Sequence, residues 1–273
     1  MEPHLIFMDI DGTLVDNHQN ISKKTKKVIN HLQELGHLFY VATGRKFSSA
    51  ATIANTLSPQ TQVVASNGSI YSIHSQLVKH QLSKEALILI YNAVSEIAMP
   101  IFFFGEHTVF YTEELPEYFT KSDQARITNE SEKEFVAIRS LSDLIDHHKE
   151  IINGIIISET DLEGLHSLKD KLEDSQLLSV SSSHFNNIEL IPKGVNKATA
   201  ILAIQDKLMI PSERVISFGD GINDIEMLEA TGISVAMGNA QGKVKAAATY
   251  VTDSNLDDGI ANFLQNHFQL THF

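Results

Sequence analysis

A pair of aspartates follows an apolar segment close to the start of the chain. Residues 5–8 are uninterrupted apolar sequence, and Asp9 and Asp11 come directly after them, before Gly12, which allows a tight turn. A short apolar run of this kind predicts a parallel strand that is covered on both faces. Two carboxylates at a buried strand end repel each other unless a cation or a shared proton relieves the repulsion. The spacing therefore indicates a functional site, although Asp-Gly alone is also a common turn dipeptide.

Other polar side chains stand where further strands are expected to end and where one helix is expected to begin. They are Thr43 after residues 38–42, Asn67 after 63–65, Lys197 in the first turn of a helix at 195–208, and Asp220, Asn223 and Asp224 after 215–218. The carboxyl ends of parallel strands lie along one edge of a sheet, where open α/β proteins bind their ligands. We therefore expect these side chains to gather around Asp9 and Asp11.

The gathered side chains are typical of a site for a divalent cation and a phosphoryl group. Carboxylate oxygens in a chain without cysteine suit a hard cation, and Mg²⁺ commonly binds one or two carboxylates together with a phosphate oxygen. Backbone N–H groups of the turns at Gly12 and Gly44, with Thr43 and Lys197, are able to hold the phosphoryl oxygens.

A carboxylate in such a site can accept the phosphoryl group, since aspartyl-phosphates are known intermediates. Asp9, which is closer to the strand, is the expected nucleophile. Asp11 is the expected acid that protonates the leaving oxygen and the base that then activates water. This role predicts a pKa of Asp11 above its ordinary value.

The order of the expected elements predicts an α/β protein with an insertion. Strands and helices alternate in the first part of the chain and again from residue 192 onward, which is typical of a doubly wound parallel, Rossmann-like sheet. Residues 83–188 interrupt this alternation and are expected to form an inserted α+β cap domain. The core domain is then formed by residues 1–82 and 189–273. The polar segment 113–134 shows no clear element.

Composition restricts the classes of partner. The 273 residues carry a formal net charge of −13, which argues against nucleic acid because such a partner needs a basic face. No apolar run is long enough to predict a membrane span, and the first strand begins too early to leave room for a signal peptide. We expect a cytoplasmic protein that binds a small phosphorylated metabolite. Its oligomeric state is not indicated.

Four short motifs resemble those of the haloacid dehalogenase-like hydrolase superfamily. They are Asp9-Ile10-Asp11-Gly12-Thr13, Ala42-Thr43-Gly44-Arg45, Lys197, and Gly219-Asp220-Gly221-Ile222-Asn223-Asp224. The insertion between the second and third motifs is similar to that of the Cof-type sugar-phosphate phosphatases, as are segments 66–68 and 192–197. The resemblance covers nearly the whole chain. It implies a phosphatase whose cap domain closes over the substrate and selects it.

The resemblance also implies a role for each matching residue. Asp9 would be the nucleophile and a Mg²⁺ ligand, and Asp11 would be the general acid/base and offer its backbone carbonyl to the metal. Asp220 would be the third protein ligand, supported by Asp224. The groups that would hold the phosphoryl group are Thr43, Lys197, Asn223 and backbone groups at Ile10 and Gly44. Arg45 and Asn67 are expected to contact the substrate.

Two other functions stay open at this level. A phosphomutase would form the same aspartyl-phosphate and return the phosphoryl group to another hydroxyl of the sugar. A regulator that binds a phosphorylated metabolite without turning it over would keep the same fold, although the intact set of acidic residues argues against it.

Overall fold

The computed structural model describes residues 2–74, 76–113, 134–182 and 185–270. The chain divides into two compact units, Met1–Val78 with Val195–Phe273, here called the core unit, and Lys79–Gly194, here called the inserted unit. The boundaries predicted from the sequence, 82/83 and 188/189, differ from these by a few residues. The second boundary differs because the strand that contains residue 188 continues to Pro192.

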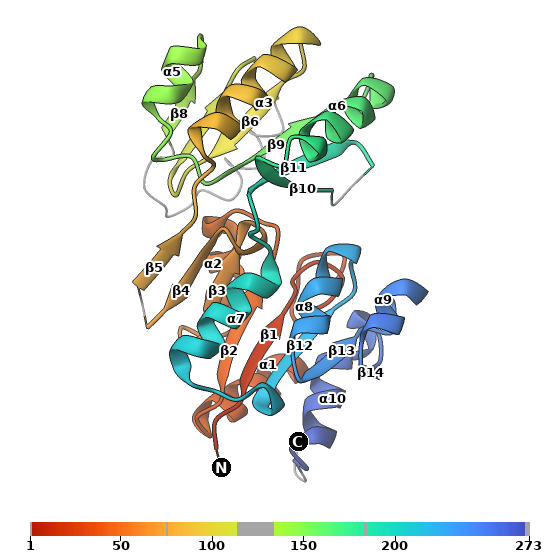
Figure 1. Ribbon diagram of the computed structural model, residues 1–273. Helices are drawn as coiled ribbons and strands as arrows, with labels where there is room; N and C mark the ends of the chain where they lie inside the picture. Colours follow the sequence, from red (N-terminus) through yellow and green to blue (C-terminus); the bar gives the residue numbers. More distant parts are fainter. Residues whose placement is uncertain (1, 75, 114–133, 183–184, 271–273) are drawn as a thin grey trace. The chain divides into compact units, whose positions relative to one another are not determined.

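A sheet of eight strands forms the middle of the core unit (Figure 1), in the order β14-β13-β12-β1-β2-β3-β4-β5. The strands are β1 Leu5–Met8, β2 Leu38–Ala42, β3 Gln62–Ala65, β4 Ile70–Ile73, β5 Gln76–Lys79, β12 Val215–Gly219, β13 Ile233–Ala236 and β14 Tyr250–Val251. The fully buried β1 pairs in parallel with β2 on one side and with β12 on the other. From β14 to β3 the sheet is parallel, which confirms the predicted fold class.

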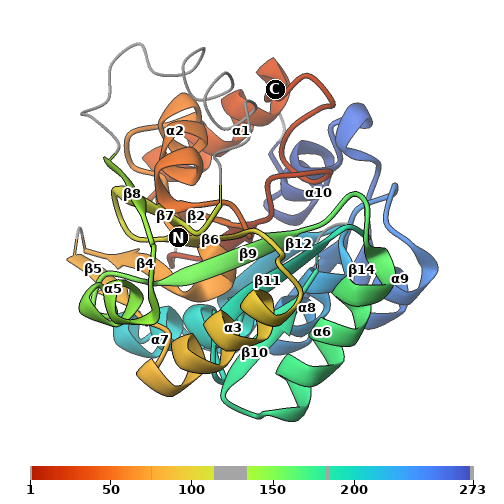
Figure 2. The same ribbon diagram turned by 90° about the horizontal axis from the view of Figure 1, so that it is seen from above.

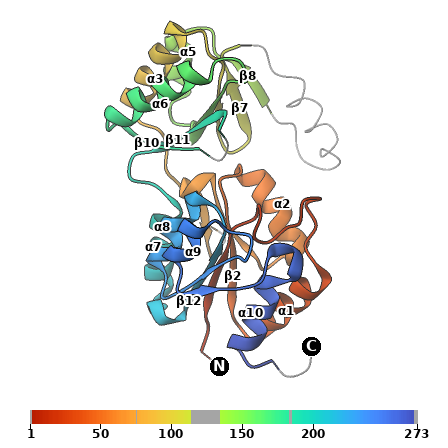
Figure 3. The same cartoon turned by 90° about the vertical axis from the view of Figure 1, so that its right-hand side faces the viewer.

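Helices cover both faces of this sheet. They are α1 Lys23–Glu34, α2 Phe47–Leu57, α7 Lys197–Leu208, α8 Ile225–Ala230, α9 Gly242–Ala247 and α10 Gly259–His267. Figure 3 shows α1, α2 and α10 on one face and α7, α8 and α9 on the other. The predicted cap of α1 is confirmed, because the Ser22 side chain accepts a hydrogen bond from the Thr25 N–H. Within the described residues, no helix is both long and apolar enough to cross a lipid bilayer.

The edge of the sheet beyond β3 is not parallel. Only the 3-10 turn Ser66–Gly68 and one further residue separate β3 from β4, whereas a parallel pair needs a crossover of about a dozen residues or more. β4 therefore returns antiparallel to β3, with Val64 opposite Tyr71.

Side-chain alternation along β1 determines the direction of Asp9. Leu5 and Phe7 pack into the same apolar cluster as Ile201 of α7. Successive side chains of a strand point to opposite faces, so Asp9, two residues after Phe7, emerges on the face that α7 covers. The pattern of the strand thus directs Asp9 toward the helix that begins with Lys197.

The inserted unit has its own six-stranded sheet, in the order β10-β11-β9-β6-β7-β8. Its elements are α3 Lys84–Glu96, β6 Ile101–Phe104, β7 Thr108–Tyr111, β8 Glu134–Ala137, α5 Leu141–Asp146, β9 Asn153–Ile157, α6 Leu162–Asp174, β10 Leu178–Ser181 and β11 Asn187–Pro192. Its three helices lie on one face of this sheet (Figure 2), in an apolar cluster that includes Leu87, Leu144 and Leu168. This is the predicted α+β arrangement. The sequence did not predict β8, and residues 114–133 of the unassigned polar segment lie outside the described residues.

Candidate active site

Lys197 is the centre of a buried ion cluster at the end of β1. Its Nζ donates to Asp9 Oδ1 at 2.7 Å and to Asp224 Oδ1 at 2.6 Å, and all three side chains are buried. Lys197 is the first residue of α7, where a cation opposes the helix dipole. A buried ammonium is stable only when it is paired, so the two carboxylates account for a lysine at this position. Three segments that are distant in the sequence thus meet here.

The start of α7 is held by a reciprocal cap. The Asn196 side chain accepts from the Thr199 N–H at 2.8 Å, and Thr199 Oγ1 accepts from the Asn196 N–H at 3.0 Å. Two N–H groups that a helix start leaves without partners are satisfied in this way. The backbone that carries Lys197 is therefore fixed.

Asp220 lies beside the ion cluster at the end of β12. Thr13 Oγ1 donates to Asp220 Oδ1 at 2.7 Å, and Asn239 Nδ2 donates to Oδ2 at 3.3 Å. A Cβ on Gly12 would lie 2.2 Å from Asp220 Oδ2, and the φ of Gly12 is +79°. Only glycine fits this close approach, so the loop after β1 and the loop after β12 are in direct contact.

Asp224 shapes the loop that carries Asp220. Its Oδ2 accepts from the backbone N–H groups of Asp220 at 3.0 Å and Gly221 at 2.9 Å, while its Oδ1 accepts from Lys197. Both oxygens of this fully buried carboxylate are therefore already engaged. Asp224 positions its neighbours more than it offers a free ligand atom.

The acidic side chains are close enough to share one cation. Carboxylate oxygens of Asp9, Asp220 and Asp224 all lie within 4.8 Å of one another, although those of Asp224 already accept hydrogen bonds from Lys197 and from the Asp220 and Gly221 N–H groups. An all-oxygen set suits a hard divalent cation such as Mg²⁺. Lys197 alone does not neutralise the three carboxylates. The donor chemistry and the charge of the site therefore fit a bound divalent cation.

The pKa values of the cluster reflect this excess of negative charge. Burial and the charge of Asp224 raise the pKa of Asp9, although Lys197 acts in the opposite direction. Burial raises the pKa of Asp220 to about 6, against the hydrogen bond from Thr13. Burial alone would lower the pKa of Lys197, but the charges of Asp224 and Asp9 raise it overall. A divalent cation would relieve the repulsion among the carboxylates.

Asp11 is paired with Arg45. Arg45 Nε donates to Asp11 Oδ2 at 2.7 Å, and the same guanidinium forms an ion pair with Oδ1. Burial acts toward a higher pKa of Asp11, but the hydrogen bonds and charge of Arg45 outweigh it and the pKa is lowered. The raised pKa predicted for Asp11 is therefore wrong for this state, because the guanidinium stabilises the ionised carboxylate.

The loop after β2 brings Thr43 to the same edge of the sheet. Thr43 is buried, its N–H donates to Val64 O at 2.9 Å, and its Oγ1 accepts from the Arg45 N–H at 3.2 Å. The Asn67 N–H donates to Thr43 O at 3.0 Å, and a Cβ on Gly44 would lie 3.2 Å from Asn67 Oδ1. Thr43, Gly44 and Asn67 thus form one packed group.

Ile10 and Asn223 lie on the loops that follow β1 and β12. The carbonyl of the buried Ile10 accepts from the N–H groups of Leu14 at 3.0 Å and Val15 at 3.1 Å, which closes the turn that carries Asp11. Asn223 is half-buried and covers Gly221, whose Cβ would be 2.4 Å from Asn223 Oδ1. The phosphate contacts expected of Ile10 and Asn223 stay predictions.

Asn239 belongs to the site although the sequence motifs do not single it out. It follows β13, and its Nδ2 donates to Gly12 O at 2.8 Å as well as to Asp220. Its Oδ1 accepts from the Asn255 N–H at 3.1 Å, which fixes the amide. The rule that polar residues at strand ends gather at one edge identified Asp220, and the same rule applies to Asn239.

Comparisons with known proteins agree with this fold and site. A family model described as haloacid dehalogenase-like hydrolase matches residues 6–264. The 5-amino-6-(5-phospho-D-ribitylamino)uracil phosphatase YitU of Bacillus subtilis is 28% identical, over 98% of this chain and 99% of that protein. The pyridoxal phosphate phosphatase YbhA of Escherichia coli is 26% identical, over 98% of this chain and 99% of that protein.

Solved structures share the fold over the whole chain. A haloacid dehalogenase-like hydrolase from Bacteroides thetaiotaomicron matches with a TM-score of 0.83 and 25% identity, covering 98% of this chain and 100% of that chain. The subclass IIB sugar phosphatase BT4131 matches with a TM-score of 0.80 and 25% identity, over the same shares. The chain therefore belongs to the haloacid dehalogenase-like hydrolases, which confirms the resemblance to the Cof type. It is a phosphatase, and it acts on phosphorylated small molecules.

Proposed function

We propose that the protein is a Mg²⁺-dependent phosphomonoesterase that hydrolyses small phosphorylated metabolites, sugar phosphates first among them, through an aspartyl-phosphate on Asp9. The observation that carries the proposal is the buried contact between Lys197 and Asp9, with Asp220 beside it. A nucleophilic carboxylate, a cation for the phosphoryl oxygens and an acidic site for a metal stand together there. Few other functions need this combination.

Asp9 and Asp220 would hold the metal with their carboxylates, and Asp11 with its backbone carbonyl. Asp224 would support them through its bonds to the Asp220 loop and to Lys197. The cation supplies charge neutralisation for the transferring phosphoryl group. This assignment explains why so many carboxylates are buried beside a single lysine.

In the first step an oxygen of Asp9 would form a bond to phosphorus while the bond from phosphorus to the ester oxygen breaks. Lys197, the Thr43 hydroxyl, Asn223 and the N–H groups of Ile10 and Gly44 would hold the phosphoryl oxygens. Asp11 would give its proton to the leaving alcohol. For this step Asp11 must be protonated, and so it must leave the ion pair with Arg45.

In the second step water would attack phosphorus and the bond to Asp9 would break, which releases inorganic phosphate. Asp11, now ionised, would take the proton of that water. The low pKa that Arg45 imposes on Asp11 suits this second step, since a base must be free of its proton. The Arg45 contact would thus favour one of the two roles of Asp11 over the other.

The proposed substrate class follows from the relatives. YitU and YbhA are named for phosphate esters of small polar molecules, and BT4131 is named as a sugar phosphatase. What these substrates share is one phosphate monoester on a small organic alcohol. The inserted unit would contribute the residues that distinguish one alcohol from another.

The proposal is tested by phosphate release from a panel of sugar phosphates, nucleotides and phosphorylated cofactors, with and without Mg²⁺. We expect turnover of at least one sugar phosphate, loss of turnover on chelation, and no turnover by Asp9→Asn. An absence of Asp9-dependent phosphate release across the panel would overturn the proposal. If a sugar phosphate is instead converted to an isomer, the enzyme is a phosphomutase. If ligands bind equally well to Asp9→Asn and none turns over, the protein is a binding regulator.

A further inference from the structure

The turn Ser66–Gly68 after β3 has an unusual backbone. Ser66, Asn67 and Gly68 have φ values of +49°, +51° and +94°, so consecutive residues adopt the left-handed conformation, and all of them are buried. Residues other than glycine rarely adopt this conformation, and they keep it only where the surrounding structure imposes it. The contacts of the turn show what imposes it here.

On one side the turn is bonded to the loop after β2. The Ser66 N–H donates to Arg45 O at 2.8 Å, and the Asn67 N–H donates to Thr43 O at 3.0 Å. Two successive N–H groups therefore hold the loop that carries Thr43. A more ordinary backbone conformation at Ser66 and Asn67 would turn these donors away.

On the other side the turn touches the start of α7. A Cβ on Gly68 would lie 2.2 Å from the carbonyl oxygen of Asn196, which is the backbone rather than a flexible side chain. Asn196 is the capping residue of α7, and Lys197 follows it. Anything larger than glycine must therefore move the first turn of α7, and Lys197 moves with it.

We propose that the turn Ser66–Gly68 is a positioning element that sets the spacing between Thr43 and Lys197, so that both side chains bind oxygens of the same phosphoryl group. Gly68 is its critical residue because it lets the turn approach the Asn196 carbonyl. This inference rests on the proposed function, in which Thr43 and Lys197 hold phosphoryl oxygens. Neither Ser66 nor Gly68 needs to touch the substrate.

The test compares Gly68→Ala with Gly36→Ala. Gly36 has a φ of +92°, nearly that of Gly68, but nothing lies within 4 Å of a Cβ built on it. Both variants force alanine into the left-handed conformation, and only Gly68→Ala also meets the start of α7. A third variant, Gly68→Asn, accepts the conformation more easily but keeps the Cβ, and it provides a folded protein if Gly68→Ala does not fold.

Each variant is measured for hydrolysis of 4-nitrophenyl phosphate, for inhibition by inorganic phosphate, and for Mg²⁺ binding by calorimetry. We expect Gly68→Ala and Gly68→Asn to lose about 10- to 100-fold in kcat/KM and to bind inorganic phosphate correspondingly more weakly, since small displacements of positioning groups cost this much. Mg²⁺ binding should weaken less than phosphate binding, since Asp9 and Asp220 stand on other strands and only Asp9 contacts Lys197. Gly36→Ala should match the unmodified protein in all three measurements.

Three results would overturn the proposal: Gly68→Ala behaving as Gly36→Ala, full recovery in Gly68→Asn, or equal losses of Mg²⁺ and phosphate binding. The first two would mean that the close approach to Asn196 has no functional effect. The third would mean a general disturbance of the site. Failure of the proposed function is distinct, because the unmodified protein itself would then release no phosphate.

Discussion

The ammonium of Lys197 lies 2.7 Å from Oδ1 of Asp9, although 188 positions separate the two residues in the chain. Both groups are buried, so their mutual attraction is screened little by water. Asp9 is also repelled by Asp224, and Lys197 is the cation that counters this repulsion. Asp9, the proposed nucleophile, is therefore paired with Lys197, and Lys197 is also proposed to hold the oxygens of the phosphoryl group.

Replacing Lys197 by methionine should both inactivate and destabilise the protein. The change leaves Asp9 and Asp224 as buried carboxylates without a cation, and breaking a buried pair in this way costs roughly 3–5 kcal/mol. We expect the free energy of unfolding in urea to fall by that amount without Mg²⁺, and by less with saturating Mg²⁺. In the double variant Asp9→Asn/Lys197→Met part of the stability should return. A single variant as stable as the unmodified protein would show that the ion pair contributes nothing.

Mg²⁺ binding should weaken as the pH falls through about 6. The pKa of Asp220 is raised to about 6 by burial, so the carboxylate takes up a proton below that pH and competes with the metal. Above pH 6 the Asp220 carboxylate is ionised, and any further gain in affinity comes from Asp9, whose pKa is also raised. Calorimetric titration of the protein with Mg²⁺ between pH 5 and 8 measures this. In Asp220→Asn the step near pH 6 should disappear along with most of the affinity, while the contribution of Asp9 at higher pH stays.

Removing the Arg45 side chain should move the pH profile of hydrolysis upward. Arg45 is the main cause that lowers the pKa of Asp11 against the effect of burial, so in Arg45→Ala only Gln19 and Lys197 oppose burial and Asp11 keeps its proton to a higher pH. The alkaline limb of kcat/KM, where the proposed acid loses its proton, should shift to higher pH. Arg214→Ala is the matched control, because Arg214 pairs with Glu2 away from this site. Identical profiles for the two variants would show that Arg45 does not control Asp11.

Asn239→Ala should weaken the metal site without changing the fold. Its amide donates both to Asp220 and to the carbonyl of Gly12, and the loss of such a partner behind a metal ligand commonly costs about 10- to 100-fold in metal affinity. The exposed Asn266 on α10 provides a control in Asn266→Ala, which should bind Mg²⁺ normally. Calorimetry measures the Mg²⁺ affinity of both variants, and thermal unfolding checks that both are folded. Equal Mg²⁺ affinities would exclude a role for Asn239 at the metal.

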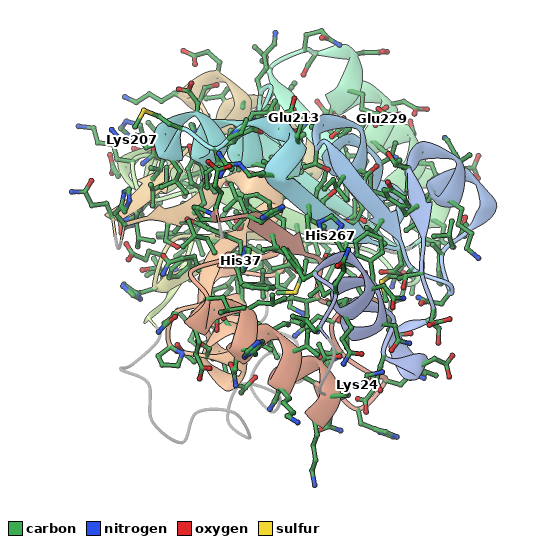
Figure 4. All side chains as sticks on the ribbon, turned by 90° about the horizontal axis from the view of Figure 1, so that it is seen from below. Lys24, His37, Lys207, Glu213, Glu229 and His267 are labelled. Atoms are coloured by element: carbon green, nitrogen blue, oxygen red, sulfur yellow. The ribbon has the colours of Figure 1, made fainter. Side chains whose placement is uncertain are left out.

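His37 should make the protein less stable in mild acid. Its ring packs against those of His4 and Phe268, and its Nδ1 accepts a hydrogen bond from the His4 N–H, which requires an unprotonated nitrogen. His267, labelled with His37 in Figure 4, contacts the same two rings. Burial, together with the charges of His4, the N-terminus and His267, lowers the pKa of His37 to about 4.

The sign of the effect follows from this shift. Unfolded histidine titrates near pH 6.5, so between about pH 6.5 and 4 the unfolded chain binds more protons than the folded one, and stability falls as the pH falls. We expect a loss of roughly 1–3 kcal/mol over this interval, measured by urea unfolding at several pH values. His37→Phe should flatten the curve, whereas the exposed His107→Gln should leave it unchanged. If stability falls as steeply with pH in His37→Phe as in the unmodified protein, groups other than His37 cause the loss of stability.

The sequence predicted the core of the fold because its strands are short apolar runs that end in polar residues. Residues 5–8 have this form, residues 215–218 have it apart from Ser217, and the two segments became the central pair β1 and β12. The convergence of Asp9, Asp220 and Asp224 followed from one rule, that parallel strands end at one edge of the sheet, and Lys197 was expected to reach this edge from the start of its helix. No rule about spacing along the chain would have joined residues so far apart.

Features that depend on side-chain pairing between loops could not be predicted. The bond between Arg45 and Asp11 joins two loops whose local sequences do not specify each other, and it reverses the pKa shift expected of Asp11. The left-handed conformation of Ser66 has no sequence signal, since serine ordinarily avoids it. The antiparallel direction of β4 was not predicted either, because only the short connection after β3 indicates it.

The pairing of β1 with β12 has a consequence for synthesis of the chain. Leu5 lies opposite Val215, so one edge of β1 has no native partner until residue 215 has been synthesised. Before then the nascent chain holds an apolar strand with free backbone donors and acceptors, which is a template for aggregation. The inserted unit is translated in the meantime and can fold first. Closure of the core sheet therefore waits for the synthesis of β12, and chaperones that shield apolar strands should matter most in that interval.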